Sequence, residues 1–314
     1  MKLRETRNIL CGGESIAITT ATHTKWDYSI GFNCQLSEDF KELTLSRGKN
    51  KPWCSAYVTI DTQTVSIHKF TTTDVHVGSI EHGLNIKDFL YCTLTAQDNN
   101  TAKLILTSSS GSFVQNIEWN ASNGDIMAET SSELTNCELI YTVNAINRSL
   151  WIFGDSYFDF WTRIVCYYGY NSFMEDAHSG RQSKAAIGAL KEYLNYGTPQ
   201  KIVWFMGMND PDRDEINPNY KESVDELIAL CNKHEIELVV SRIPTTTARD
   251  HSYKNEYLRS LGIPCLELDR ALGVKEDGTW FDGLLREDQV HPTPLGTRAI
   301  ASYVINALPE ITKQ

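Results

Sequence analysis

Alternating apolar and polar positions predict β-strands in the first 150 residues of the chain. Residues 55–60 and 65–68 are two alternating runs joined by a polar turn, a pattern that indicates a hairpin. Four more short runs are separated by turn-rich pieces: Phe89 to Leu94, Ala102 to Leu106, Phe113 to Trp119 and Leu139 to Val143. Short strands at this spacing are typical of an antiparallel sandwich.

The pattern changes near residue 148, where apolar runs begin to alternate with segments of helical period. Residues 224–231 place apolar side chains at helical spacing, and Thr293 to Leu308 is another candidate helix. The apolar runs are Leu150 to Phe153, Ile202 to Met206, Ile236 to Val240 and Ile263 to Leu266. Such alternation predicts a parallel sheet flanked by helices, so we expect a β-sandwich at residues 1–147 and an α/β domain at residues 148–314.

The composition is that of folded domains, and the charge excludes some classes of binding partner. The chain has 314 residues, 41% of them hydrophobic and 22% charged, which excludes disordered and coiled-coil chains. The net charge is −11 and no Lys/Arg cluster interrupts it, so we expect neither nucleic acid nor a membrane as partner. The start, Met1 to Arg7, lacks the apolar stretch of a signal peptide. We therefore expect a cytoplasmic protein unless an export signal has been removed, and the sequence leaves the oligomeric state open.

The spacing of the cysteines and of two aspartates does not indicate a metal site or a redox motif. The eight cysteines show no C-x-x-C pair and no matching histidine spacing, so we expect free thiols, although a disulfide in the first half is an open alternative. Asp210 and Asp212 alone rarely suffice to hold a cation. We expect no metal and no cofactor.

A serine follows the first apolar run of the second half. Leu150 to Phe153 leads directly into Gly154-Asp155-Ser156, which places a hydroxyl at the carboxyl end of a parallel strand, where open α/β sheets bind their ligands. A serine hydroxyl becomes a nucleophile only when a base removes its proton. His291 is the best candidate base, and Asp288, three residues earlier, could orient its imidazole.

Two further segments could stabilise a developing oxyanion. The run Ile202 to Met206 ends in Gly207-Met208-Asn209, so the Asn209 amide would emerge at the same edge of the sheet as Ser156. Gly180 could add a backbone N–H, because a missing side chain permits close approach. The Ser156 N–H would be the third donor.

Together and in this order, these pieces resemble the four sequence blocks of the SGNH hydrolase superfamily, the GDSL-type esterases and lipases. The resemblance covers roughly Leu150 to Leu308 and implies a flavodoxin-like α/β/α sandwich. It implies Ser156 as nucleophile, His291 as general base and Asp288 as third member of a triad. Gly180, Asn209 and the Ser156 N–H would form the oxyanion hole. Tyr157 departs from the family pattern, which has Leu or Ile after the serine.

The sequence leaves the roles of several residues near the predicted site open. Some family members use a Ser-His dyad in which a backbone carbonyl replaces the aspartate, so Asp288 could be dispensable. Asp155 is expected to be a buried carboxylate that binds backbone N–H groups. Tyr157, His178 and Trp280 could line the substrate pocket, or they could serve packing and capping. For Tyr157, with Phe158 and Trp161, helix packing is the favoured reading.

The two-domain plan resembles carbohydrate esterases with an N-terminal jelly roll, which implies removal of acetyl groups from glycans. We therefore expect a serine esterase for small acyl esters, with an acylated small molecule or glycan as partner. The alternatives are a lipase or thioesterase for longer chains and a non-catalytic glycan-binding protein. The sandwich could itself bind glycan or merely brace the second domain. Five aromatic residues are candidates for glycan binding by the sandwich: Trp26, Trp53, Tyr57, Tyr91 and Trp119.

Overall fold

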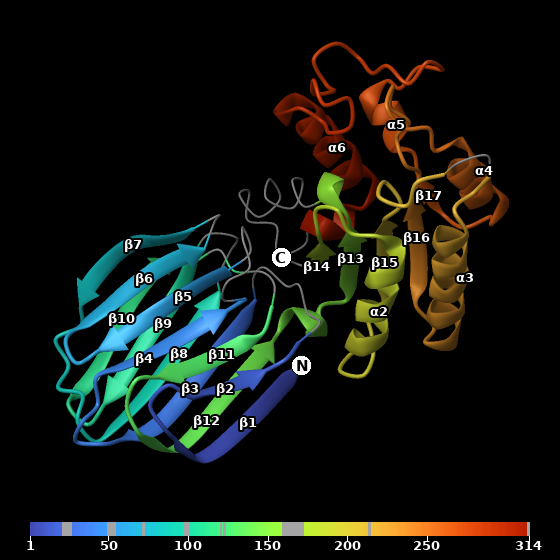
Figure 1. Ribbon diagram of the computed structural model, residues 1–314. Helices are drawn as coiled ribbons and strands as arrows, with labels where there is room; N and C mark the ends of the chain where they lie inside the picture. Colours follow the sequence, from blue (N-terminus) through green and yellow to red (C-terminus); the bar gives the residue numbers. More distant parts are fainter. Residues whose placement is uncertain are drawn as a thin grey trace. The chain divides into compact units, whose positions relative to one another are not determined.

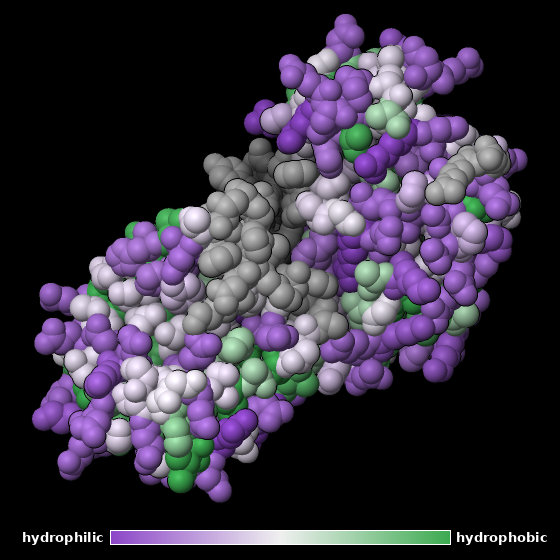
Figure 2. All heavy atoms as spheres, viewed as in Figure 1, coloured by the Kyte–Doolittle hydropathy of each residue, from purple (hydrophilic) through white to green (hydrophobic). Residues whose placement is uncertain are grey.

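The chain divides into two compact units, Met1–Ala145 and Ile146–Gln314, called here the β unit and the α/β unit (Figure 1). The computed structural model describes these residues: 1–20, 27–48, 55–70, 73–96, 101–119, 121, 124–158, 173–212 and 215–312. Hydrophilic residues cover most of the coloured surface in Figure 2, and apolar residues form small separate patches on that face.

The β unit consists of two six-stranded antiparallel sheets. One sheet has the order β1-β12-β3-β8-β9-β10 and the other β2-β11-β4-β5-β6-β7. The strands are β1 (Lys2–Leu10), β2 (Ser15–Ile18), β3 (Tyr28–Leu36), β4 (Glu42–Arg47), β5 (Ser55–Asp61), β6 (Thr64–Phe70), β7 (Asp74–Glu81), β8 (Phe89–Ala96), β9 (Thr101–Ser108), β10 (Gly111–Glu118), β11 (Ile126–Thr130) and β12 (Leu134–Val143). All six strand runs predicted in this part of the chain coincide with strands, namely β5, β6, β8, β9, β10 and β12, so the antiparallel prediction is confirmed.

Local chemistry explains the predicted hairpin. β5 and β6 pair antiparallel, and the Asp61 carboxylate accepts the backbone N–H groups of Gln63 (2.7 Å) and Thr64 (2.6 Å). A side chain that binds the backbone two residues ahead favours a turn. On β9, Ala102, Leu104 and Leu106 are fully buried, in alternation with more exposed neighbours. One face of the strand therefore supplies the core.

Polar side chains join the two sheets inside the β unit. The Arg47 guanidinium of β4 lies 4.2 Å from the ring centroid of Tyr28 on β3, a cation–π contact across the sandwich. The Trp119 indole donates to the Tyr28 hydroxyl at 2.7 Å. Trp119 is fully buried, so the expectation that it could form an exposed sugar platform is wrong, whereas Tyr91 is 41% exposed. Trp26 and Trp53 lie outside the described residues.

The α/β unit is built on a five-stranded parallel sheet with the order β14-β13-β15-β16-β17. Its strands are β13 (Leu150–Gly154), β14 (Phe173–Ala177), β15 (Lys201–Phe205), β16 (Glu237–Ser241) and β17 (Cys265–Leu266). Its helices are α2 (Ser183–Tyr193), α3 (Pro218–Lys233), α4 (Ser252–Ser260), α5 (Leu268–Leu272) and α6 (Pro294–Ala307), with 3-10 turns at Ala145–Asn147 and Pro309–Thr312. Read along the chain, this order is 2-1-3-4-5, the flavodoxin-like order. The α/β prediction is confirmed.

Sequence patterns predicted four of these five strands and missed β14. Glu175 and Asp176 interrupt the apolar run of that strand, yet all five of its residues are buried. The helix predicted at residues 224–231 lies within α3, where Val224, Leu227 and Cys231 are buried. Helix α2 packs against α3, and α5 packs against α6 (Figure 1).

The described cysteines have free thiols: Cys11, Cys34, Cys92, Cys137, Cys231 and Cys265. Burial raises the pKa of Cys231 to about 12, so this thiol stays protonated at neutral pH. Cys54 and Cys166 lie outside the described residues. None of the helices in the described part of the chain combines the length and apolar character that a membrane crossing requires.

Shortening a buried side chain in the core of the β unit should lower the stability of this unit. Leu104→Ala removes a fully buried side chain from the centre of β9, so we expect the free energy of unfolding of this unit to fall by about 2–5 kcal/mol. Lys103→Ala, on the exposed face of the same strand, is the matched control and should change it by less than about 0.5 kcal/mol. Urea unfolding measures both, and equal losses would contradict the assigned core.

Candidate active site

Three neighbouring strands end at one edge of the parallel sheet. Gly154, the last residue of β13, pairs with Ala177 of β14 and with Phe205 of β15. The loops that follow these strands carry Ser156, Gly180 and Asn209 in turn. Parallel strands share a carboxyl edge, so the sheet order itself gathers these three segments.

Ser156 begins a helical turn directly after β13 and is buried. Gly154 makes that turn possible, because a Cβ at this position would lie 2.4 Å from Cβ of Phe158. The Asp155 carboxylate accepts the N–H of Tyr157 (3.2 Å) and the N–H of Met208 (3.1 Å). Asp155 is therefore the buried, backbone-binding carboxylate that the sequence predicted, and it joins the serine turn to the loop after β15.

The structure brings Ser156, His291 and Asp288 into one hydrogen-bonded chain. Ser156 Oγ lies 3.0 Å from His291 Nε2, and His291 Nδ1 lies 2.8 Å from Asp288 Oδ2. His291 precedes α6 and is separated from Ser156 by 135 positions in the sequence. This is the geometry in which an imidazole can take the proton of a serine hydroxyl while a carboxylate stabilises the resulting cation.

Backbone hydrogen bonds fix the Asp288 carboxylate toward His291. Its Oδ1 accepts the N–H groups of Val290 (2.9 Å) and His291 (2.8 Å), which leaves Oδ2 for the imidazole. Partial burial acts to raise the pKa of Asp288, but these N–H groups and the imidazole outweigh it and lower the pKa to about 2. Asp288 is therefore ionised at neutral pH.

The two other predicted oxyanion donors come from the neighbouring loops. Gly180 lies in the turn after β14 with φ +78, a backbone conformation that glycine adopts without strain. The Asn209 side-chain amide donates to the Arg181 carbonyl at 3.2 Å, and Gln182 Nε2 donates to the Asn209 carbonyl at 3.2 Å. These two bonds tie the Gly180 turn to the Asn209 loop, and one N–H of the Asn209 amide is left for a ligand.

Tyr157 connects the serine segment to the histidine loop. Its hydroxyl donates to the backbone carbonyl of Val290, the residue before His291. Its ring is buried, with a centroid 6.3 Å from that of His291 and 6.3 Å from that of Trp280. Trp280 is also buried, and its indole donates to the Thr245 carbonyl at 2.9 Å. Both aromatic side chains therefore pack around the histidine loop.

His178 lies at the end of β14, beside the Gly180 turn. Its backbone N–H donates to the Gly154 carbonyl (3.1 Å), and its own carbonyl accepts the N–H of Arg181 (3.2 Å). Its side chain is half-buried. The predicted part of this side chain in substrate binding stays a prediction, and Trp161 lies outside the described residues.

Two buried acidic residues support the oxyanion loops, and sequence reasoning gave neither this role. Asp176 of β14 forms a buried ion pair with Arg181 at 2.6 Å. Asp210 accepts the N–H and the hydroxyl of Ser183, the first residue of α2. A serine at a helix start, 27 residues before an Asn-Asp pair, carries no local signal of this contact. Contacts between loops depend on sheet order, which the sequence does not state.

Asp210 and Asp212, the two carboxylates considered as metal ligands, bind other side chains and backbone groups instead. Asp212 forms an ion pair with Lys254 at 3.0 Å and accepts the Asn217 N–H at 2.8 Å, while Asp210 binds Ser183. Among the residues that the structure describes, no group of three His, Cys, Asp or Glu side chains could hold a metal ion.

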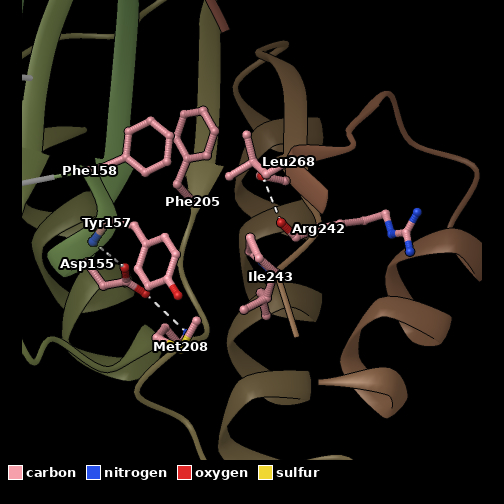
Figure 3. Close-up of a pocket in the computed structure, with 10 residues that line it drawn as sticks. Asp155, Tyr157, Phe158, Phe205, Met208, Arg242, Ile243 and Leu268 are labelled. Atoms are coloured by element: carbon pink, nitrogen blue, oxygen red, sulfur yellow. Dashed lines mark hydrogen bonds between the residues drawn. The ribbon is translucent and has the colours of Figure 1, made fainter. Parts of the chain in front are cut away.

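A small cavity lies behind Asp155 (Figure 3). Its volume is about 20 Å³, enough for about one water molecule. Tyr157, Phe158 and Phe205 line it on one side and Ile243 and Leu268 on the other, and the Arg242 guanidinium points away from it. Arg242 instead pairs with Asp269 at 2.8 Å.

The apolar surroundings change the acidity of Asp155. Burial, the largest influence, raises the pKa of this carboxyl to about 7, although the N–H groups of Tyr157 and Met208 and the Arg249 charge act in the opposite direction. A carboxyl beside Ser156 therefore changes its charge near neutral pH.

Comparisons with known proteins give similarities over about half the chain. No protein-family model matches the sequence, and no curated protein sequence matches it either. Among solved structures, a GDSL-like lipase from Bacteroides thetaiotaomicron has 17% sequence identity and a TM-score of 0.43, covering 54% of this chain and 91% of its own. A lipase/acylhydrolase from Enterococcus faecalis has 16% identity and a TM-score of 0.40, covering 53% and 99%. A psychrotrophic esterase from Pseudoalteromonas sp. has 15% identity and a TM-score of 0.41, covering 52% and 98%.

The buried Asp155 predicts a pH dependence of stability. The folded pKa of about 7 lies above the ordinary value of 3.8, so between these values the folded chain holds a proton that the unfolded chain releases. This contribution to stability is therefore largest below about pH 4 and is lost as the pH rises to about 7. In Asp155→Asn, the free energy of unfolding in urea should fall less steeply across this range than in the wild type. Asp282→Asn, at an exposed carboxylate, should keep the wild-type slope, and parallel curves for Asp155→Asn and wild type would contradict the prediction.

Proposed function

We propose that the α/β unit is a serine hydrolase that cleaves carboxylic esters. The observation that carries this proposal is the hydrogen-bonded chain from Asp288 through His291 to Ser156, with distances of 2.8 and 3.0 Å. It supplies the three elements that nucleophilic acyl transfer requires, namely a hydroxyl, a base within reach and a carboxylate that orients the base.

In the proposed reaction, His291 Nε2 takes the Ser156 proton while Oγ forms a bond to the ester carbonyl carbon. The carbonyl electron pair moves to oxygen, where the N–H groups of Gly180, Asn209 and Ser156 would stabilise the negative charge. Collapse of this intermediate breaks the bond to the alcohol oxygen, and the alcohol leaves with the proton from His291. Water then attacks the acyl-enzyme with His291 again as base, which releases the acid and restores Ser156.

The surroundings of Ser156 favour a short acyl group. In the described part of the chain, the apolar cavity next to the serine turn has a volume of only about 20 Å³, far too little for a chain of eight carbons. The larger hollow beside Asn209 has charged and amide side chains among its lining residues, next to apolar ones, which suits a ligand with polar groups better than a hydrocarbon chain. We therefore favour acetyl esters over the long-chain esters that a lipase or thioesterase would cleave.

We further propose that the alcohol is a carbohydrate. The support is the two-unit architecture, in which an antiparallel β unit precedes the α/β unit as in the carbohydrate esterases that the sequence resembles. The alternative of a non-catalytic glycan-binding protein has less support, because Ser156, His291 and Asp288 keep both competent side chains and competent geometry.

The β unit is proposed to be a jelly roll extended by two hairpins. β1, β12, β3 and β8 are neighbours in one sheet, and β2, β11, β4 and β5 are neighbours in the other. The first and last strands are thus adjacent in each sheet, as two Greek keys require. The hairpin strands β6-β7 and β9-β10 extend the sheets. Because Trp119 is buried and the Tyr57 hydroxyl is bound to Asp74, we favour a bracing role over sugar binding for this unit.

Loss of the serine hydroxyl tests the proposal directly. We expect wild type to release acetate from p-nitrophenyl acetate and to prefer it over the C8 ester, and we expect Ser156→Ala to be at least about 10⁴-fold slower. An alkyl fluorophosphonate should label wild type at Ser156, as peptide mass spectrometry would show, and should not label the variant. Unchanged turnover in a variant with the wild-type unfolding midpoint would exclude Ser156 as the nucleophile, and a preference for the C8 ester would exclude the acetyl assignment.

The role of Asp288 is tested separately, because a backbone carbonyl could replace it. In Asp288→Asn the side chain can still accept N–H groups, but the negative charge that stabilises the imidazolium is lost. We expect kcat for p-nitrophenyl acetate to fall by about 10²-fold or more. Glu287→Gln removes the neighbouring exposed charge and should leave kcat within about twofold. A loss of less than about threefold in Asp288→Asn would establish a Ser-His dyad instead.

A further inference from the structure

The hollow beside Asn209 lies between the loops that follow β15 and β16. Its volume is about 540 Å³, within the range of small-molecule sites. The lining residues are Gln182, Met208, Asn209, Pro211, Asp212, Ala248, Arg249, Asp250, His251 and Tyr253. Asn209 is one of the proposed oxyanion donors, so a molecule in this hollow would lie next to the reacting carbonyl.

The floor of the hollow carries no net charge. His251 is buried, and its Nδ1 lies 3.1 Å from Lys254 Nζ, which in turn pairs with Asp212 at 3.0 Å. Burial first, and then the charges of Lys254 and Arg249, lower the pKa of His251 to about 3, so its imidazole is neutral. The Lys254 and Asp212 charges cancel each other. The floor therefore favours a neutral ligand.

The rim offers both donors and acceptors. The Arg249 guanidinium donates from Nη1 to the Met208 carbonyl at 2.7 Å, a contact that holds it against the Asn209 loop and leaves other N–H groups for a ligand. The neighbouring Asp250 carboxylate accepts from the N–H and hydroxyl of Ser252 through one oxygen, Oδ1. Its other oxygen can accept from a ligand hydroxyl. A positive and a negative side chain next to each other match a ligand with several hydroxyl groups better than an anion or a hydrocarbon.

Tyr253 adds a flat apolar surface to this rim. Its side chain is 43% exposed, although it is one of the larger apolar groups of the α/β unit. A tyrosine ring presents an apolar face and a polar edge, which suits a molecule with C–H groups on one side and hydroxyls around it. The combination of Tyr253, Arg249 and Asp250 therefore has the chemistry of a saccharide site.

We propose that this hollow binds the saccharide part of the ester, with Tyr253 against the sugar ring and Arg249 and Asp250 on its hydroxyls. The inference rests on the proposed esterase function and adds the residues that recognise the alcohol. It assigns substrate specificity to the end of the loop after β16 and the first turn of α4, which are separate from the hydrogen-bonded chain of Ser156, His291 and Asp288.

Two kinds of acetate ester, one of a saccharide and one of a simple alcohol, separate this proposal from the general reaction. Partially acetylated xylo-, manno- and gluco-oligosaccharides and ethyl acetate give the same acetyl-enzyme, so they differ only in the alcohol that leaves. We expect wild type to have a kcat/KM at least about tenfold higher for one of the saccharides than for ethyl acetate. Tyr253→Ala and Asp250→Asn should lower kcat/KM for that saccharide by about tenfold or more, and for ethyl acetate by less than about threefold.

Tyr196→Ala is the matched control, because Tyr196 is similarly exposed in the same unit and does not line the hollow. It should leave both esters unaffected. Equal losses for both esters in Tyr253→Ala and Asp250→Asn, or no loss for either, would overturn the proposal, as would a wild type that does not prefer any saccharide.

A binding measurement distinguishes failure of the site from failure of the reaction. Ser156→Ala should bind the deacetylated form of the preferred oligosaccharide in titration calorimetry, and the added Tyr253→Ala change should weaken binding by about tenfold or more. If wild type cleaves no ester, all three deacetylated oligosaccharides are titrated. Binding that depends on Tyr253 would then refute the esterase function but support the saccharide site. Ester cleavage without saccharide binding would refute the saccharide site alone.

Discussion

The carboxylate of Asp155 is the constraint on which the candidate active site depends. One of its oxygens binds the N–H of Tyr157 in the serine turn, and the other binds the N–H of Met208 in the loop that carries Asn209. The nucleophile and a proposed oxyanion donor are thereby held at a fixed separation by one side chain. Burial makes this arrangement costly in its ionised form, as the raised pKa shows. The positive charge of Arg249 favours the ionised form of Asp155 and so offsets part of that cost. A residue of the proposed saccharide rim therefore also affects the charge of the carboxyl group that holds the serine turn.

Much of this architecture could be predicted because local patterns encode it. Strands β5 and β6 alternate cleanly, and Asp61 marks their turn. The apolar run of β13 leads directly into Ser156, which fixes the position of the hydroxyl in the sheet once the strand is known. Asp288 and His291 lie only three residues apart, so their contact depends on one loop. In each case the informative residues are close together in the sequence.

The remaining features depend on contacts between distant segments. Strand β14 carries two acidic residues and so lacks the apolar pattern of a buried strand; Asp176 can be buried because it pairs with Arg181 in the turn that follows. Alternation with polar neighbours does not say which face of its strand Trp119 belongs to, and its indole donates to the Tyr28 hydroxyl inside the sandwich. His251, which Lys254 contacts from below, lines a hollow only because the loops after β15 and β16 are neighbours. Polar residues that find partners across the fold are buried, and sequence periodicity alone assigns them to the surface.

The hydrogen bond from Tyr157 to the Val290 carbonyl has a consequence for how the protein can diverge. The acceptor is a main-chain atom, so the residue type at position 290 is free to change without loss of this bond. The donor is a side-chain phenol that spans the gap between the serine turn and the histidine loop, so a leucine or isoleucine at position 157 would remove the bond altogether. Among chains that keep this contact, sequence variation should therefore be asymmetric, with tyrosine retained beside the serine and diverse side chains accepted before the histidine.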